Sequence, residues 1–271
     1  MEPTGPQPAV ITNVADATWK YLWQVERPRF IIAVSLATLG LVLTIILEPN
    51  LVLFPIVLFI IWYGKVFARM QSQFMEQFAQ ANNFVYCPGE IPTQIYGKPF
   101  TFGHDHTFTD LVKGSIDNLP LEYFNYSYVT GYGRSRTTTS LTVMAINLGH
   151  DIPRVYAQSL GYGQKASLSQ KLSAILETPI GANKLTFGND FDKYYQVIID
   201  PGTEVETLQI FEPDLMAQLI DQPVHFDFEL SGQSLYIYTG GPVANKLVLD
   251  GFVAFARAIS ARFELETSNL D

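Results

Sequence analysis

The chain has 271 residues, of which 17 are Lys or Arg and 26 are Asp or Glu, so its formal net charge is −9. An acidic chain binds nucleic acid poorly unless its basic residues cluster, so nucleic acid is excluded as an expected partner. The single cysteine, Cys87, excludes an intrachain disulfide and favours a reducing compartment such as the cytoplasm.

The N-terminal part of the chain is typical of a disordered tail followed by a membrane anchor. Residues 1–18 contain three prolines and no periodic pattern. Two uncharged apolar runs follow, 30–47 and 51–64, and the first is long enough to cross a hydrocarbon core about 30 Å thick. Because both runs are apolar all round, we predict a two-helix transmembrane hairpin within residues 19–68 rather than a buried soluble hairpin.

The charges that flank the two runs predict an orientation in the membrane. Lys and Arg lie before the first run and after the second, and none lies in the turn between them. By the positive-inside rule, both termini are cytoplasmic and the protein is a multi-pass protein of the inner (plasma) membrane. Aromatic residues suited to the membrane interface flank the same ends: Trp19, Tyr21, Trp23, Trp62 and Tyr63.

An amphipathic helix is expected to continue from the second run through residues 69–83 as a stalk. Apolar side chains recur there at steps of three and four residues, at Phe67, Met70, Phe74, Phe78 and Ala81. This stripe is expected to pack on the domain that follows; the alternative is that it binds a partner helix.

Residues 84–271 are predicted to form a cytoplasmic α+β domain with a largely antiparallel sheet and a C-terminal helix. Aromatic, β-branched and threonine residues predict its first strands, at 84–87, 121–130, 137–147 and 154–159. A helix is expected next, at 167–176, on the spacing of its leucines and isoleucine.

The last third of the chain predicts further strands and helices. Strands are expected at 184–188 and 194–199, and a capping box of Thr203 with Glu206 predicts a helix that Pro213 restarts. Two strands, 224–230 and 235–239, are expected to pair as a hairpin across a Ser-Gly-Gln-Ser turn. A core-facing stripe predicts a final helix over 245–265, with Val248, Phe252, Phe255, Ile259 and Phe263 inside.

Part of this last third resembles a known bacterial family. The run FGNDFDKYYQVIIDPGTEVETLQIFEPDLMAQLIDQPVHFDFELSGQSLYIY has residues where the family pattern places them, at Phe191, Tyr195, Val197, Pro213, Leu215 and Met216. In residues 184–240 and in its anchor, the chain is similar to bacterial two-span membrane proteins with a domain of unknown function numbered three-one-three-seven. Residues 100–160 do not match. The resemblance implies a membrane-tethered cytoplasmic domain and no known reaction.

The histidines were weighed as metal ligands. His104 and His106 alternate along a segment that, as a strand, would place both imidazoles on one face. A catalytic zinc site needs a third protein ligand, and no paired motif indicates one, although His150-Asp151 and His225-Phe226-Asp227 are candidates. The alternative is an exposed loop before a strand, and we predict no metal, no cofactor and no catalytic residue.

The segment 131–136 is predicted to be the tip of a β-hairpin and places Tyr132, Arg134 and Arg136 together on an otherwise acidic domain. Guanidinium groups suit phosphate oxygens, so these three residues are the candidate ligand-binding residues, for an anionic headgroup or a protein partner. The alternative is a solvated turn whose arginines protect the edge of the sheet.

Three hypotheses about function follow. The first is a non-enzymatic, membrane-anchored module for binding or scaffolding, with the lipid bilayer as a partner through two transmembrane helices. The second is a membrane-bound, metal-dependent hydrolase that uses His104 and His106. The third is a structural subunit that assembles through its two spans, although no ladder of small residues specifically indicates this.

Overall fold

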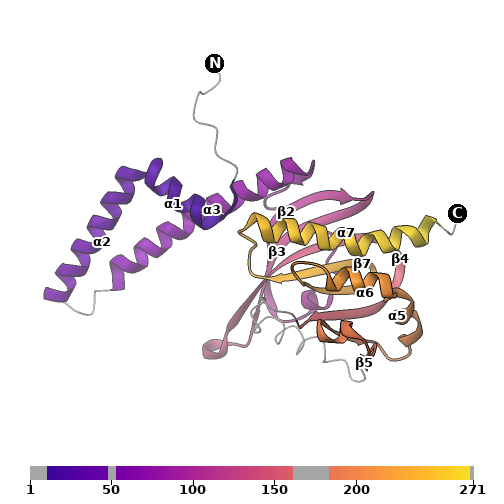
Figure 1. The fold of residues 1–271 in the computed structure, drawn as a ribbon. Helices are drawn as coiled ribbons and strands as arrows, with labels where there is room; N and C mark the ends of the chain where they lie inside the picture. Colours follow the sequence, from indigo (N-terminus) through magenta and orange to yellow (C-terminus); the bar gives the residue numbers. More distant parts are fainter. Residues whose placement is uncertain (1–10, 48–52, 161–182, 269–271) are drawn as a thin grey trace, which may run out of the picture. The chain divides into compact units, whose positions relative to one another are not determined.

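The computed structural model describes residues 11–47, 53–160 and 183–268 (Figure 1). The chain divides into two compact units. Met1–Phe78 with Ala244–Lys246 forms the first, and Ala79–Val243 with Leu247–Asp271 forms the second. The first unit is built from helices, and the second from a β-sheet with helices packed against it.

The first unit begins with α1 (Val14–Gln24), which starts inside the segment predicted to be disordered. The side chain of Asn13 accepts hydrogen bonds from the backbone N–H groups of Ala15 and Asp16, at 2.9 and 3.3 Å, and so caps the helix. Asp16 also adds negative charge to the first turn, where the helix dipole favours it. The predicted tail therefore extends too far, because this cap was overlooked; residues 1–10 lie outside the described ranges.

Two longer helices follow, α2 (Arg27–Leu47) and α3 (Leu53–Ala81), at the positions of the two apolar runs. Within the described part of the chain, no helix combines the length and the apolarity that crossing a membrane requires. The predicted transmembrane hairpin is therefore not supported. The turn expected between the two helices falls in residues 48–52, which are not among the described residues.

The helix α3 continues past the apolar run without a break, which confirms the predicted helical extension. Met70, Phe74 and Phe78 of the predicted stripe are buried, whereas Phe67 is half-buried and Ala81 is exposed. The helix ends at Ala81, two residues before the predicted end of the stalk.

The second unit is organised around a sheet of seven strands among the described residues, and all of its neighbouring strands run antiparallel. Its order is β1-β2-β3-β4-β6-β5, and β7 pairs with β4 off this path. The strands are β1 (Val85–Tyr86), β2 (His104–Ile116), β3 (Leu119–Thr130), β4 (Thr137–Ser159), β5 (Asn183–Leu185), β6 (Tyr195–Ile199) and β7 (Asp227–Gly240). The predicted α+β class with a mostly antiparallel sheet is confirmed.

Two of the strands are longer than the sequence suggested. Predicted separately at 137–147 and 154–159, the two segments of β4 form one strand whose first part pairs with β3 and whose last part pairs with β6. The predicted hairpin of 224–230 with 235–239 is wrong, because β7 runs through its Ser-Gly-Gln-Ser segment. Both of its halves pair with β4, through a register irregularity near Ile152 and Gly232.

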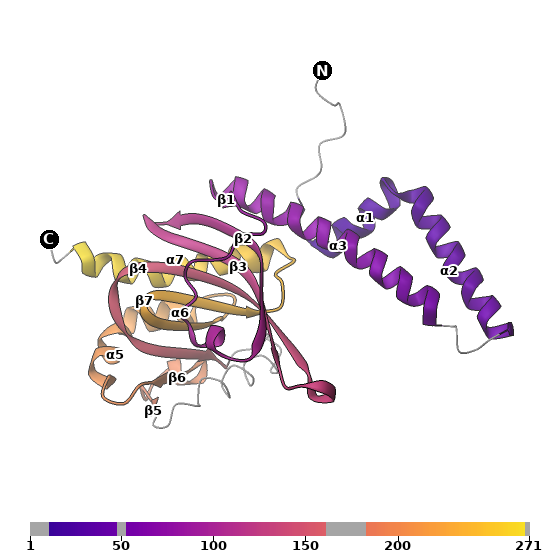
Figure 2. The ribbon, with the colours of Figure 1, turned by 180° about the vertical axis from the view of Figure 1, so that it is seen from behind.

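One face of this sheet is covered by the C-terminal helix α7 (Lys246–Ser268), as Figures 1 and 2 show. Phe252 packs its ring against Phe226 and Tyr123, at centroid distances of 4.8 and 6.2 Å. Phe255 and Ile259 of the predicted stripe are also buried, which confirms the core-facing side of this helix. The side chain of residue 263 lies outside the described residues.

Two short helices, α5 (Glu204–Ile210) and α6 (Pro213–Ile220), stand where the sequence predicted them. The predicted capping box is absent, since the Thr203 hydroxyl donates to the carbonyl oxygen of Asp200 at 2.8 Å rather than accepting from the helix. Short 3-10 helices complete the unit at Lys98–Thr101, Gly133–Ser135 and Asp190–Lys193. The helix expected at 167–176 lies outside the described residues.

Packing of α7 on the sheet predicts a large cost for truncating Phe252. Its side chain is fully buried, so Phe252→Ala should lower the free energy of unfolding by about 3–5 kcal/mol in chemical denaturation. Leu247→Ala, at a side chain that is 76% exposed on the same helix, should change it by less than about 0.5 kcal/mol. Equal effects of the two substitutions would contradict this packing.

Candidate functional site

The face of the sheet opposite α7 is lined by aromatic side chains. Residues 88–103, which we call the strap, run across this face (Figure 2). Tyr126 of β3 and Tyr236 of β7 belong to the buried cluster on this face. Phe100, in the 3-10 helix of the strap, packs against both rings at 5.0 and 5.7 Å. Phe100 thereby anchors the strap in the aromatic cluster on this face of the sheet.

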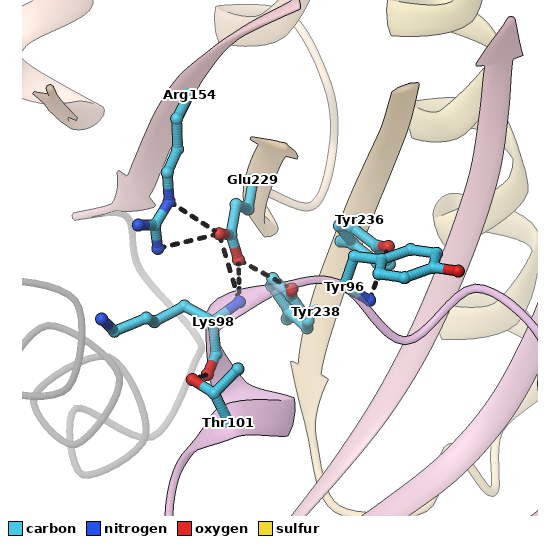
Figure 3. A network of polar contacts seen from close by, with 7 residues as sticks. All are labelled: Tyr96, Lys98, Thr101, Arg154, Glu229, Tyr236 and Tyr238. Atoms are coloured by element: carbon cyan, nitrogen blue, oxygen red, sulfur yellow. Dashed lines mark hydrogen bonds and ion pairs between the residues drawn. The ribbon is translucent and has the colours of Figure 1, made fainter. Parts of the chain in front are cut away.

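A buried glutamate on β7 fastens this strap to the sheet (Figure 3). Glu229 is fully buried, and its carboxylate accepts two hydrogen bonds from the backbone N–H of Lys98, at 3.0 and 3.2 Å. Tyr238 donates its hydroxyl at 3.0 Å, and the Arg154 guanidinium binds through Nε and Nη2 at 3.3 and 3.2 Å. Burial raises the pKa of Glu229, while Arg154 and the Lys98 N–H act in the opposite direction.

A second buried carboxyl group, Asp227, lies two residues earlier on the same face of β7. It accepts a hydrogen bond from the backbone N–H of Ser159 at 2.8 Å and another from the Tyr156 hydroxyl at 3.3 Å. Burial raises the pKa of Asp227 to about 7, although these two donors lower it. The pKa of the Tyr156 hydroxyl lies well above its usual value, because burial raises it and the charges of Asp227 and Glu229 raise it further.

Glu122 on β3 holds the other end of the strap. Its carboxylate accepts the backbone N–H groups of Thr93 and Gln94, at 2.8 and 3.0 Å, and the Thr93 hydroxyl at 2.8 Å. Between the two glutamates, the Tyr236 hydroxyl accepts the Tyr96 N–H at 3.1 Å. Both oxygens of Glu122 and Glu229 are thus bonded to protein donors, so this cluster can hold the strap in place.

This cluster was not predicted, although the sequence of β7 carries a signal for it. Asp227 and Glu229 alternate with Phe226, Phe228 and Leu230 along this segment. Because the strand is buried on both faces, the face that carries the two acids is also inside the protein. Asp227 was considered only as a metal ligand beside His225, whose ring contacts the Ile220 carbonyl oxygen at 3.1 Å. Glu229 finds its donor at Lys98, 131 residues away in the chain, and no local pattern reveals such a partner.

His104 and His106, the pair of the alternative metal hypothesis, make separate contacts. His104 Nε2 lies 3.1 Å from the Gly131 carbonyl oxygen, and His106 Nδ1 lies 2.6 Å from the Tyr126 hydroxyl. Asp105 between them has a positive φ of 53°, and the register shifts there, so the alternation of a regular strand is broken. Among the described residues, no three His, Cys, Asp or Glu side chains are placed to hold a metal ion.

The hairpin tip, residues 131–136, joins β3 to β4 as predicted and gathers more residues than the sequence suggested. Tyr132 stacks on His104 with a centroid distance of 4.5 Å and an interplanar angle of 10°. Arg136 Nη2 lies 3.2 Å from Asp105 Oδ2, which also lies 3.3 Å from His104 Nδ1. The candidate residues Tyr132, Arg134 and Arg136 are all exposed, and one histidine of the metal hypothesis joins them.

Comparison with known proteins gives no function to transfer. No protein-family model matches the chain, and no curated protein matches its sequence. Among solved structures, the crystal structure of the mycobacterial trehalose monomycolate transport factor A matches with a TM-score of 0.49 and 13% sequence identity. The match covers 72% of this chain and 94% of that chain, and a likeness this slight carries no conclusion about fold or function.

The raised pKa of Asp227 leads us to expect that the free energy of unfolding falls as the pH rises. Its pKa is about 7 in the folded protein against an ordinary 3.8, so the folded state holds a proton that the unfolded state has lost. The stabilisation is complete below pH 3.8 and is lost as the pH rises through 7, a change on the order of 4 kcal/mol. Denaturation from acidic to neutral pH should show this loss in the wild type and not in Asp227→Asn. The exposed Asp151→Asn is the control, and an unchanged pH dependence in Asp227→Asn would refute the assignment.

At Gly97 the strap lies so close to Tyr238 that a larger residue should destabilise the protein. Removing the Tyr238 hydroxyl should relieve this destabilisation. A Cβ at this position would lie 2.5 Å from the Tyr238 hydroxyl oxygen, so Gly97→Ala should lower the unfolding free energy by about 1–3 kcal/mol. The same substitution in a Tyr238→Phe background should cost clearly less, because the clashing oxygen is gone. Gly251→Ala, whose Cβ would meet Val224 at an ordinary 3.7 Å, serves as the control. Strict additivity of Gly97→Ala and Tyr238→Phe would show that the strap does not lie this close.

Proposed function

We propose that the protein is a membrane-associated, non-enzymatic binding or scaffolding module. In this proposal the helical first unit associates with the bilayer, and the α+β unit offers its exposed surfaces to a partner. The carrying observation is the exposure of large apolar side chains along α2 and α3. The buried acids support the non-enzymatic part, since protein donors already occupy them.

Apolar exposure on α2 and α3 is extensive. The side chains of Ile32, Leu36 and Ile60 are 58, 62 and 61% exposed. Others on the same two helices are Ile31, Val34, Leu39, Val42, Val57, Leu58 and Ile61. On α2 these positions spread over an arc of about 200° around the helix axis, which is wider than the seam that a single partner helix covers and favours surrounding lipid. Patches of this kind on a soluble surface would promote aggregation.

Aromatic and basic side chains meet where the three helices of this unit come together. Trp19 packs against Phe30 and Tyr63, at centroid distances of 6.0 and 5.6 Å, and Phe30 stacks on Trp62 at 6.2 Å. The Arg27 guanidinium lies 5.2 Å from the centre of a Trp23 ring. Such a mixture suits the headgroup region of a bilayer, where amphipathic rings and cations settle.

The finer parts of this proposal come from the sequence. The distribution of Lys and Arg predicts cytoplasmic termini and an inner (plasma) membrane location. The resemblance to the bacterial two-span family predicts a tethered cytoplasmic domain. Assembly through α2 and α3 is the competing function that the same exposed surface allows, and it predicts a protein that stays in solution as an oligomer.

The membrane proposal predicts partition of the full chain into membranes. After expression in bacterial cells, the wild type should sediment with membranes and resist carbonate extraction. Leu36→Lys with Ile60→Lys should move it to the soluble fraction, because each charge costs roughly 2.5–3.5 kcal/mol in hydrocarbon. Val205→Lys, at a side chain that is 66% exposed in α5, is the matched control and should leave the distribution unchanged. A wild-type protein found mainly in the soluble fraction would overturn the proposal.

A further inference from the structure

We propose that the hairpin tip is a second membrane contact, which binds the phosphate groups of anionic lipid headgroups. This inference rests on the proposed membrane association and adds a specific surface to it. The residues concerned are Tyr132 and Arg134, with His104, Asp105 and Arg136 as their support.

Charge is distributed unevenly within the tip. Arg136 is paired with Asp105, and both side chains are 59% exposed. The same carboxylate oxygen also faces His104 Nδ1, so a single acid is shared by two basic groups. Arg134 makes no hydrogen bond or ion pair within the described ranges, and its guanidinium is exposed to solvent. On a chain with a net charge of −9, this is a local surplus of positive charge that suits phosphate oxygens.

The tip extends well beyond β7 in the sheet, while β2 stays paired with β3 as far as Val129. Pairing of β3 with β4 continues to Thr130 and Thr137, whereas β7 stops pairing with β4 at Leu141. Figures 1 and 2 show this hairpin projecting from the end of the sheet. A surface that projects in this way can reach a flat bilayer without the rest of the unit touching it.

The backbone and the rings of the tip are held in one arrangement. Gly131 has a φ of 71°, and a Cβ there would lie 2.5 Å from the Ser135 carbonyl oxygen, so only glycine fits the turn. Tyr132 stacks on His104 and still leaves 79% of its surface exposed. An exposed tyrosine beside an exposed arginine is suited to the interface between water and lipid, where an apolar ring and a polar tip are both accommodated.

A lipid surface fits this tip better than a small phosphate compound does. Sites for small ligands are concave and bury most of the ligand among converging groups. The tip is a projecting turn with one uncommitted guanidinium, which can contact a headgroup from one side only. Many weak headgroup contacts at a surface compensate for the lack of enclosure, with an expected gain of about fivefold per basic residue.

The test uses the full chain with a fluorescent label near the tip. Thr138→Cys in a Cys87→Ser background carries an environment-sensitive dye, and the protein is reconstituted into vesicles of neutral phosphatidylcholine, with or without anionic phosphatidylglycerol. Emission should shift to the blue in the anionic vesicles and return as salt is added. Arg134→Gln should lower the ratio of bound to free tip about fivefold, and Arg257→Gln, at an exposed arginine of α7, should not change it.

The outcomes separate this inference from the proposed function. Protein that stays with both vesicle types but shows the same emission in each overturns the tip inference alone. Protein that binds only the anionic vesicles supports the tip and overturns the anchor, and protein that binds neither overturns both. If inorganic phosphate reverses the emission shift more than chloride does at the same ionic strength, the tip is a site for small phosphates and the lipid inference is wrong.

Discussion

Burying an ionisable carboxyl group inside a sheet is costly unless donors surround it, and this unit buries three on one face. Glu122, Asp227 and Glu229 are each nearly or fully inaccessible to solvent. The two glutamates are satisfied largely by backbone N–H groups of the strap, which therefore has to lie on the sheet. Gly97 permits the close approach, and Phe100 completes the aromatic core beneath. These polar contacts and the aromatic cluster beneath them together close this face of the sheet.

This arrangement bears on what the α+β unit can do. An acid that serves as a catalyst must reach a substrate, and here the carboxylates are committed to the protein itself. The opposite face is occupied by α7 through Phe252 and its neighbours. Among the described residues of this unit, the hairpin tip is exposed and projects from the sheet.

The sequence predicted those elements whose interactions are local in the chain and missed those that depend on residues far apart in the sequence. The hairpin of β3 with β4, the helices α5 and α6 and the core-facing side of α7 follow from local patterning, and all were predicted. Strand β2 was missed because Asp105 and Asp110 adopt positive φ values of 53° and 56°, which break the alternation that marks a strand. Gly232, with a φ of 60°, was interpreted as a turn, whereas it sits at an irregularity of the continuous strand β7.

The candidate site was predictable only in part, for the same reason. The tip residues were found because they adjoin one another in sequence and stand out against an acidic chain. Their connection to His104 and Asp105 depends on the pairing of β2 with β3, which the sequence did not reveal. Glu229 depends on Lys98 of the strap, 131 residues away in the chain, and Asp227 on Ser159, 68 residues away, and a pattern within one strand cannot identify such donors.

Hydrogen exchange at the strap amides tests the account most directly. The N–H groups of Thr93, Gln94, Tyr96 and Lys98 donate to sheet side chains, so they should exchange as slowly as the paired amides of β3 and β4. In Glu229→Gln, protection at Lys98 should fall while protection at Thr93 and Gln94, which depends on Glu122, is kept. Exchange of all four amides at the rate of an exposed loop in the wild type would contradict the account, because the sheet face would then be open.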